Sequence, residues 1–259
     1  MKKTVLLAFV FAFLLASCSS PADPTLPLAT TSPEVSSEPA AAETVPAQPA
    51  EPEHSAFYIP GTPVEDVILY FNEVCLDAEF VDSGNPYVLQ KWRIPICYRL
   101  YGTYTESDVA ALTDFVDWLN SIEGFPGIRQ ARDGDIENLH IHFCDAANMI
   151  ELMGDTFSGL DGAVTFWYDF NEIYDAVICC RTDIDQYTRN SVILEELYNG
   201  LGPIQDTSLR QDSIIYSGFS EPQKLSQMDE LLLKLLYHPQ LSCGMDAENC
   251  EAMIRQLYY

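Results

Sequence analysis

The composition of residues 19–56 confines folding to the rest of the chain. This segment is rich in Pro, Ala, Ser, Thr and Glu, with six acidic residues and no basic or aromatic ones. Such a segment cannot bury enough apolar surface to offset its loss of conformational entropy. The sequence therefore predicts a disordered linker over residues 19–56 and one folded domain over residues 57–259, which are long enough to enclose a core.

The first eighteen residues have the pattern of a signal peptide. Two lysines precede an apolar run from Val5 to Ala16, which as a helix would span about 18 Å of a bilayer core about 30 Å thick. The run ends in Leu-Ala-Ser-Cys, which resembles a bacterial lipobox with Cys18 as the lipidated residue. The resemblance implies an exported lipoprotein, anchored to a membrane at the bacterial cell envelope through Cys18. A secretory signal with a coincidental cysteine is the alternative.

The charge balance excludes one large class of partner. The chain has 13 basic and 39 acidic residues, a net charge of −26, and −22 of this falls on residues 57–259. A field of this sign repels phosphate backbones and anionic headgroups. We therefore expect no nucleic-acid partner, and contact with the membrane only through the lipid anchor.

Seven cysteines follow Cys18, and export predicts that some of them form disulfides. An odd number leaves at least one thiol free or paired between molecules. Cys243 and Cys250 are the best candidates for a bridge because a short loop joins them beside the last helix. A metal–thiolate site is the competing interpretation, although the sequence contains no CxxC pair. The pairing of the others stays open: Cys75, Cys97, Cys144, Cys179 and Cys180.

Apolar periodicity and capping residues predict an α/β domain with a smaller helical C-terminal part. Strands are expected at 91–101, 138–143, 164–168 and 173–183, with a turn near Asn171. Helices are expected at 105–122, after Asp145, and at 187–200, 226–237 and 247–257. Adjacent residues on a strand face opposite sides, so Cys179 and Cys180 should point apart.

The run from Leu194 to Asp206 bears most directly on function. Metzincin-type zinc peptidases carry HExxHxxGxxH, in which three histidines bind zinc, the glutamate activates water and the glycine permits a turn. The run resembles this motif without its histidines. In that frame Glu195 takes the first ligand place, Glu196 the general-base place, Asn199 the second ligand place, Gly202 the turn and Gln205 the third ligand place.

The resemblance continues beyond this run. Ser213–Tyr216 stands where such enzymes have a Met-turn, with Ile215 in place of the methionine, and residues 224–237 resemble the segment that leads into their final helix. Residues 88–246 are also similar to a family of bacterial exported proteins catalogued as domain of unknown function 2927. The similar residues are Lys91-Trp92, Glu195-Glu196, Asn199, Leu201-Gly202, Gln205-Asp206, Ser213-Ile214, Asp229, residues 236–239 and Gly244-Met245. This implies a metzincin-like fold with a degenerate zinc motif and no established activity.

The altered motif offers only oxygen donors, from Glu195, Asn199 and Gln205 or Asp206. Zinc prefers nitrogen and sulfur, and calcium usually requires six or more oxygens. We therefore expect no metal cofactor at this position. We expect a structural role instead, in which Glu195 and Glu196 form hydrogen bonds with nearby backbone and Gln205 ties the loop after Gly202 to the preceding helix. Two alternatives stay open: a catalytic site of another kind, and a zinc or calcium site.

His140 and His142 alternate along a predicted strand and share a face with Cys144. This spacing suits a metal, but it also suits the polar face of a half-buried strand. No third ligand is evident nearby, which favours the polar face.

These patterns predict a cell-envelope lipoprotein whose domain is a non-catalytic binding or scaffolding module. Its partner would be a peptide or an envelope protein. Its former cleft either adds an extended peptide to a sheet edge or is closed. The alternative is a peptidase-like hydrolase that uses Glu196 as general base.

Overall fold

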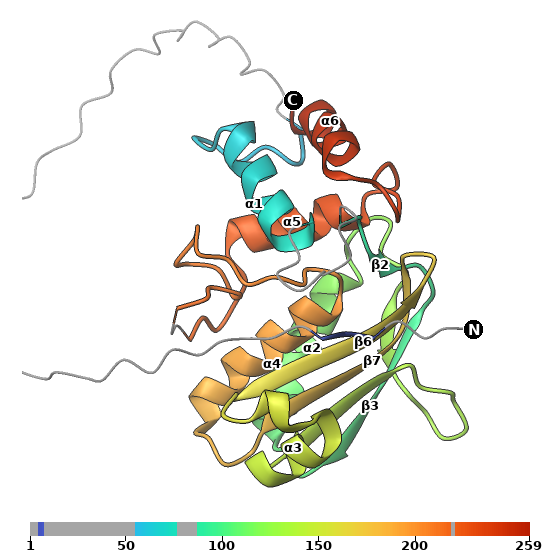
Figure 1. The fold of residues 1–259 in the computed structure, drawn as a ribbon, viewed down its shortest axis with the longest axis vertical. Helices are drawn as coiled ribbons and strands as arrows, with labels where there is room; N and C mark the ends of the chain where they lie inside the picture. Colours follow the sequence, from blue (N-terminus) through green and yellow to red (C-terminus); the bar gives the residue numbers. More distant parts are fainter. Residues whose placement is uncertain (1–4, 8–54, 77–86, 219–220) are drawn as a thin grey trace, which may run out of the picture. The chain divides into compact units, whose positions relative to one another are not determined.

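The architecture is a mostly parallel sheet with helices on both faces. The computed structural model describes residues 5–7, 55–76, 87–218 and 221–259, and within them the strands run in the order β1-β6-β7-β5-β3-β4 (Figure 1). β3, β4, β5 and β7 are parallel, while β6 is antiparallel to β7, and β1 to β6. A short β2 pairs with β7 outside this path. The strands are β1 Val5–Leu7, β2 Lys91–Trp92, β3 Ile96–Gly102, β4 Ile128–Gln130, β5 Leu139–Cys144, β6 Gly162–Asp169 and β7 Glu172–Arg181.

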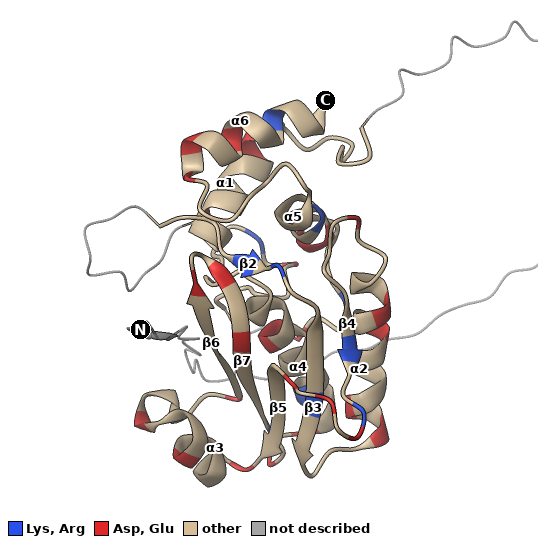
Figure 2. Cartoon of the chain, turned by 90° about the vertical axis from the view of Figure 1, so that its right-hand side faces the viewer, with Lys and Arg blue, Asp and Glu red and all other residues tan. Residues whose placement is uncertain are grey.

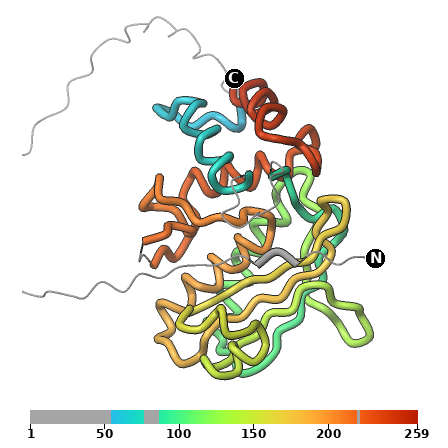
Figure 3. The backbone as a smooth tube through the Cα atoms, viewed as in Figure 1, coloured from blue at the N-terminus to red at the C-terminus, as the bar shows by residue number. Residues whose placement is uncertain are grey.

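The helices form one layer on each face of the sheet and a separate group made of α1, α5 and α6 (Figures 1 and 3). α2 and α4 pack together on one face of the sheet, where α4 contacts β6 and β7. α3 contacts β7 from the other face, and α1 packs against α5 and α6. The helices are α1 Val64–Leu76, α2 Glu106–Leu119, α3 Ala146–Met153, α4 Gln186–Gly200, α5 Gln227–Tyr237 and α6 Ala247–Tyr258, with a 3-10 turn at Asp155–Phe157. The predicted mixed α/β class is confirmed.

The predicted helix starts are confirmed by their capping bonds. Thr105 and Ser226 each form a capping box with the aspartate three residues later, and Asp145 accepts a bond from the backbone of Asn148. These side chains satisfy backbone N–H groups that a helix cannot pair internally. Local sequence therefore sets where these helices begin.

The single strand expected at residues 91–101 is wrong, because the chain breaks into β2 and β3. Residues 93–95 lie between them, and Pro95 lacks the N–H that a continuous ladder requires. The break separates their partners: β2 pairs with the start of β7, whereas β3 lies between β4 and β5. The sequence-based assignment also lacks α1, β4, the short β1 and the 3-10 turn.

The hairpin between β6 and β7 turns at Phe170 and Asn171, both with positive φ (51° and 65°). Asparagine tolerates this conformation better than most residues, and two successive positive φ values match the twist of a tight hairpin. The turn predicted near Asn171 is therefore confirmed. β6 is the only antiparallel neighbour that β7 has in the described sheet.

The main core fills the space between the sheet and the helices on one face and extends to α1, α5 and α6. Lys91 lies inside it, 2% exposed, and donates through Nζ to the carbonyls of Leu236 (2.6 Å) and Leu241. Burial lowers the pKa of Lys91 to about 8. The ammonium group thus ties β2 to the end of α5.

Acidic side chains spread over α2, α3, α6 and the β6–β7 hairpin (Figure 2). No helix in the described ranges combines the length and apolar character needed to cross a bilayer. Cys18 and residues 19–54 lie outside these ranges, so the predicted lipobox and linker stay predictions.

All seven cysteines of the described segments are free thiols, so the predicted Cys243–Cys250 bridge is absent from the structure. Cys250 is fully buried in α6, whereas Cys243 is half-buried with its thiol toward the Lys91 carbonyl (3.8 Å). A short loop in the sequence did not make these two thiols partners. Cys179 and Cys180 do face opposite sides of β7, because they belong to separate apolar clusters.

Candidate functional site

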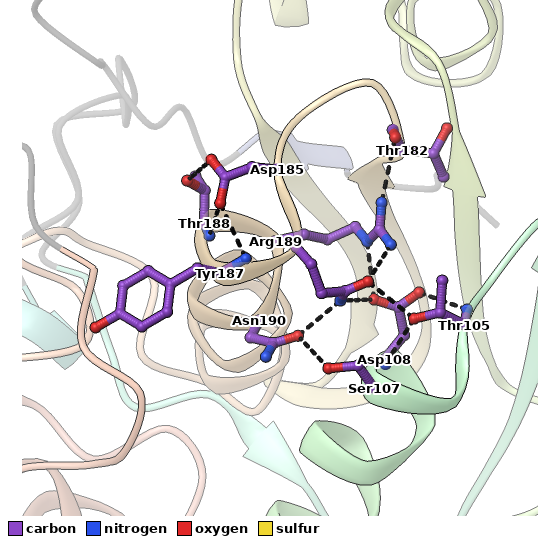
Figure 4. Close-up of polar contacts among 10 residues, drawn as sticks. Thr105, Ser107, Asp108, Thr182, Asp185, Tyr187, Thr188, Arg189 and Asn190 are labelled. Atoms are coloured by element: carbon purple, nitrogen blue, oxygen red, sulfur yellow. Dashed lines mark hydrogen bonds and ion pairs between the residues drawn. The ribbon is translucent and has the colours of Figure 1, made fainter.

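The N-terminal end of α4 is fixed by a buried ion pair. Asp185 caps the helix by accepting from the backbone of Tyr187 and Thr188. Arg189 donates through Nε to Asp108 on α2 (2.8 Å) and through Nη1 to the Thr182 carbonyl (3.2 Å), as Figure 4 shows. This anchors the long helix to its neighbour α2.

Asp108 is fully buried, and its partners decide its charge. Burial opposes ionisation, but hydrogen bonds from Arg189, Gln186 and Thr105 outweigh it and lower the pKa of this carboxyl. Gln186 donates to the carboxylate at 2.6 Å. A charge held by several donors in the interior orients both helices.

The C-terminal end of α4 is capped by residues from distant segments. Trp92 donates through Nε1 to the Gly200 carbonyl (2.8 Å), and the Tyr237 hydroxyl donates to the Leu201 carbonyl (2.7 Å). Gly202 follows with a φ of 131°, and a Cβ there would lie 2.6 Å from the Gln90 carbonyl oxygen. The glycine predicted to make the turn is required by this close approach.

The loop after Gly202 is held by α1. The backbone N–H groups of Ile204 and Gln205 both donate to the Val74 carbonyl, at 3.0 and 3.3 Å. Thr207 then bonds Glu73 through its hydroxyl. The loop is thus tied to α1 both by backbone groups and by the side chain of Glu73.

Residues 213–216, at the position compared with a Met-turn, donate hydrogen bonds to a buried aspartate. Asp229 on α5 accepts from the hydroxyls of Tyr70 and Ser213, both at 2.7 Å, and from the backbone of Ile214 at 3.1 Å. Ile215 is itself fully buried. A carboxylate satisfied by these donors stabilises the junction of α1, this loop and α5.

The two residues in the ligand and base places of α4 are enclosed. Glu196 is 1% exposed and Asn199 is 2% exposed, and neither Oε2 of the first nor Oδ1 of the second has a hydrogen-bond partner. Gly162 at the start of β6 covers Glu196 so closely that a Cβ there would lie 2.7 Å from its Oε1. The general-base position is therefore closed to substrate and solvent.

The acidic residues of the motif influence one another strongly. Burial and the charge of Asp206 raise the pKa of both Glu195 and Glu196 well above the ordinary value. Glu195 and Asp206 are half-buried. The structure therefore brings these three carboxyls into one electrostatic group in which protonation is favoured.

Zinc does not fit this group. Its donors are carboxyl and amide oxygens where zinc peptidases have imidazole nitrogens, and Glu196 is aimed at backbone. Among the described residues, no group of three or more His, Cys, Asp or Glu side chains is arranged to hold a metal ion.

The two strand histidines both stack on Tyr101, with ring centroids 6.0 Å away for His140 and 4.7 Å away for His142. His140 also approaches Asp175 (Nε2–Oδ1 3.3 Å). Both are half-buried on β5. The arrangement is that of a polar strand face.

A groove of about 460 Å³, not expected from the sequence, lies between α2, α4 and the segment before α5. Its apolar wall includes Phe115, Trp118, Leu194 and Leu225. On α2 and α4, apolar residues at this spacing also mark core positions. A sequence pattern of this kind therefore does not distinguish a groove from a core.

The fold and site define a class of protein: a mixed α/β domain whose long helix α4 carries an enclosed acidic group. Asp185 caps the N-terminal end of this helix, and the distant residues Trp92 and Tyr237 cap its C-terminal end. The profile of the family described as "Protein of unknown function (DUF2927)" matches residues 65–256, so the chain belongs to that family. No curated protein matches the chain. Lys91, Trp92, Gly202, Asp229 and Tyr237, which carried the resemblance to this family, all serve structural contacts here.

Proposed function

We propose that the chain is a lipid-anchored envelope protein whose domain is a non-catalytic, metzincin-like module that binds an extended segment of a partner along β6. The observation that carries the proposal is the antiparallel pairing of β1 with β6, in which Val5 lies opposite Trp167 and Leu7 opposite Thr165. Residues 5–7 fall within the predicted signal peptide. Export would remove them and leave this edge of the sheet open.

An open edge strand is a template for another chain. Its outward N–H and C=O groups are unpaired, and main-chain hydrogen bonds to an added strand supply affinity while alternate side chains supply specificity. In the structure, β6 pairs with the extended residues 5–7 in the antiparallel sense, which supports this mode of binding. The partner's chemistry is therefore that of an extended, mainly apolar peptide.

Three features support a non-catalytic role. The three metal-binding histidines are missing from the motif. Glu196 is covered by Gly162, and the capping of α4 by Trp92 and Tyr237 holds that arrangement in place. A general base must lie within hydrogen-bond reach of the proton it abstracts, and this one faces backbone.

One observation favours the alternative of a hydrolase. The pKa of Glu196 is raised by burial and by Asp206, and its Oε2 has no partner, both of which are common at catalytic carboxyls. In that case Glu196→Gln would abolish a measurable hydrolysis of peptide or peptidoglycan substrates. Under our proposal the variant binds its partner as the wild type does.

The test uses a peptide with the sequence of residues 3–10 and the chain beginning at residue 18. Two isomers carry N-methyl groups on alternate residues, one set on each edge of the extended peptide. A strand paired along one edge uses only alternate N–H groups. We expect one isomer to lose binding while the other retains it. Equal binding of the two isomers would contradict the proposal. So would a failure of the unmethylated peptide and of both isomers to bind.

A further inference from the structure

A second, smaller apolar cluster lies under α3, on the face of the sheet opposite α4 (Figure 1). It contains four sulfur atoms, from two cysteines and two methionines. Cys179 is 0% exposed and Met149 is 1% exposed, whereas Cys144 and Met153 lie at its half-buried rim. The remaining members are apolar: Phe157, Leu160, Ala163 and Val177.

The four sulfurs come from three neighbouring elements. The thiols of Cys144 on β5 and Cys179 on β7 belong to the same cluster and are close enough to influence each other's pKa. Met149 and Met153 lie one helical turn apart on α3, so their side chains share a face. The fold thus brings two thiols and two thioethers into one pocket of the core.

The register of the strands opposes a disulfide between the two cysteines. Cys144 lies opposite Arg181, two residues beyond Cys179. Strands about 4.8 Å apart with a rise of about 3.3 Å per residue place such diagonal Cα atoms about 8 Å apart. A disulfide usually spans about 4.4–6.8 Å. By contrast, a metal ion between two thiolates spans a sulfur–sulfur distance longer than a disulfide bond, because each metal–sulfur bond is about 2.3 Å long.

We propose that Cys144, Cys179, Met149 and Met153 form a binding site for one soft monovalent metal ion, Cu(I). Thiolate and thioether sulfurs select Cu(I) over harder ions, and the cluster that holds these sulfurs is otherwise made of apolar side chains. The half-buried Cys144 and Met153 give the ion a path from solvent. This site is independent of β6 and of the acidic group on α4.

Charge and protons balance without a redox step. Burial raises the pKa of both thiols, so each carries its proton when no metal is bound. Cu(I) displaces the proton of one thiol, which leaves to solvent, and the resulting thiolate neutralises the ion in a low-dielectric site. Asp145 and Asp183 lie close enough to influence Cys144, while the nearby Arg181 is paired with Asp161 and Asp183.

The test is a titration of the reduced full chain in detergent, without oxygen, against a chromophoric Cu(I) chelator. We expect one Cu(I) per chain and a rise in the unfolding temperature on binding, because a ligand that binds only the folded state stabilises it. Zinc at the same concentration should leave both readouts unchanged. Absence of Cu(I) uptake by the folded, reduced chain would overturn the proposal.

Variants locate the site. The double variant Met149→Leu, Met153→Leu conserves volume and keeps the core packed. We expect its Cu(I) affinity to fall more than tenfold, and that of Cys179→Ser or Cys144→Ser to fall further. Met228→Leu and Cys97→Ser, which change buried sulfurs elsewhere, should bind as the wild type does. Unchanged affinity in the double leucine variant, or a Cys144–Cys179 disulfide in chain isolated from the envelope, would overturn the proposal.

Discussion

Glu196 on α4 lies against the backbone of Gly162 on β6, and a Cβ on residue 162 would stand 2.7 Å from Oε1 of the glutamate and 2.4 Å from Val192 Cγ1. Helix and strand therefore meet at a position where only glycine fits. The contact closes the general-base position and sets how closely α4 packs against β6.

Gly162→Ala should destabilise the protein by about 1–3 kcal/mol, because the added methyl group overpacks this contact. Denaturant unfolding measures the loss. Combining it with Val192→Ala should recover part of the stability, since the smaller side chain makes room for the methyl group. Wild-type stability in Gly162→Ala would show that β6 and α4 do not meet as described.

Glu196→Gln should stabilise the protein increasingly as the pH rises. The pKa of Glu196 is raised in the folded state by burial and by the charge of Asp206. The folded protein then holds a proton that the unfolded chain releases, so the wild type loses stability as the pH rises above about 4.3. Glutamine resembles the neutral acid and removes this loss. Unfolding free energies at pH 5 and pH 7 test the difference; a larger loss in the variant than in the wild type contradicts it.

Asp108→Asn should cost about 3–5 kcal/mol, because it leaves the Arg189 charge buried without its partner. The lowered pKa of Asp108 means that the wild-type contribution is present above about pH 4 and is lost as the pH falls. The variant should therefore depend less on pH in acid. Asp135→Asn, at the exposed ion pair with Arg129, is the matched control and should change stability little. Equal effects of the two substitutions would refute the distinction.

Cys18→Ala should release the protein from membranes, because the proposed lipid attached to this residue is its anchor. Fractionation of cells, with mass spectrometry of the N-terminal peptide, measures anchoring and lipid together. Cys243→Ala is the matched control and should stay with the membrane. Retention of Cys18→Ala in the membrane fraction would refute lipidation as the means of attachment.

Local patterns predicted much of the fold. The capped helices α2, α3 and α5 begin at the residues that their side chains indicated. β5 alternates buried and half-buried residues, and β6 and β7 lie where strands were predicted. α1 also carries helical spacing, with Val64, Val67, Ile68 and Phe71 buried, but its position beside the linker obscured it. The break between β2 and β3 has two causes. Pro95 lacks an N–H group, and β2 and β3 pair with different strands, which local sequence does not show.

The site was less accessible to sequence reasoning, because its decisive contacts are distant in the chain. Glu196 and Gly162 are 34 positions apart in the sequence, and nothing local shows that one covers the other. Similarly, Trp92 reaches Gly200 across more than 100 residues. Sequence reasoning located the helix and the run that resembles a zinc motif, whereas the enclosure of Glu196 depends on packing between distant segments.

The most direct measurement of the central claim is amide hydrogen exchange along β6 in the chain beginning at residue 18. Without a partner, the outward-facing amides of residues 162–169 should exchange rapidly, because no neighbouring strand protects them. Addition of the peptide corresponding to residues 3–10 should protect these amides and leave the groove between α2 and α4 unchanged. Protection at the groove instead, or unchanged exchange along β6 at saturating peptide, would contradict a binding role for this edge.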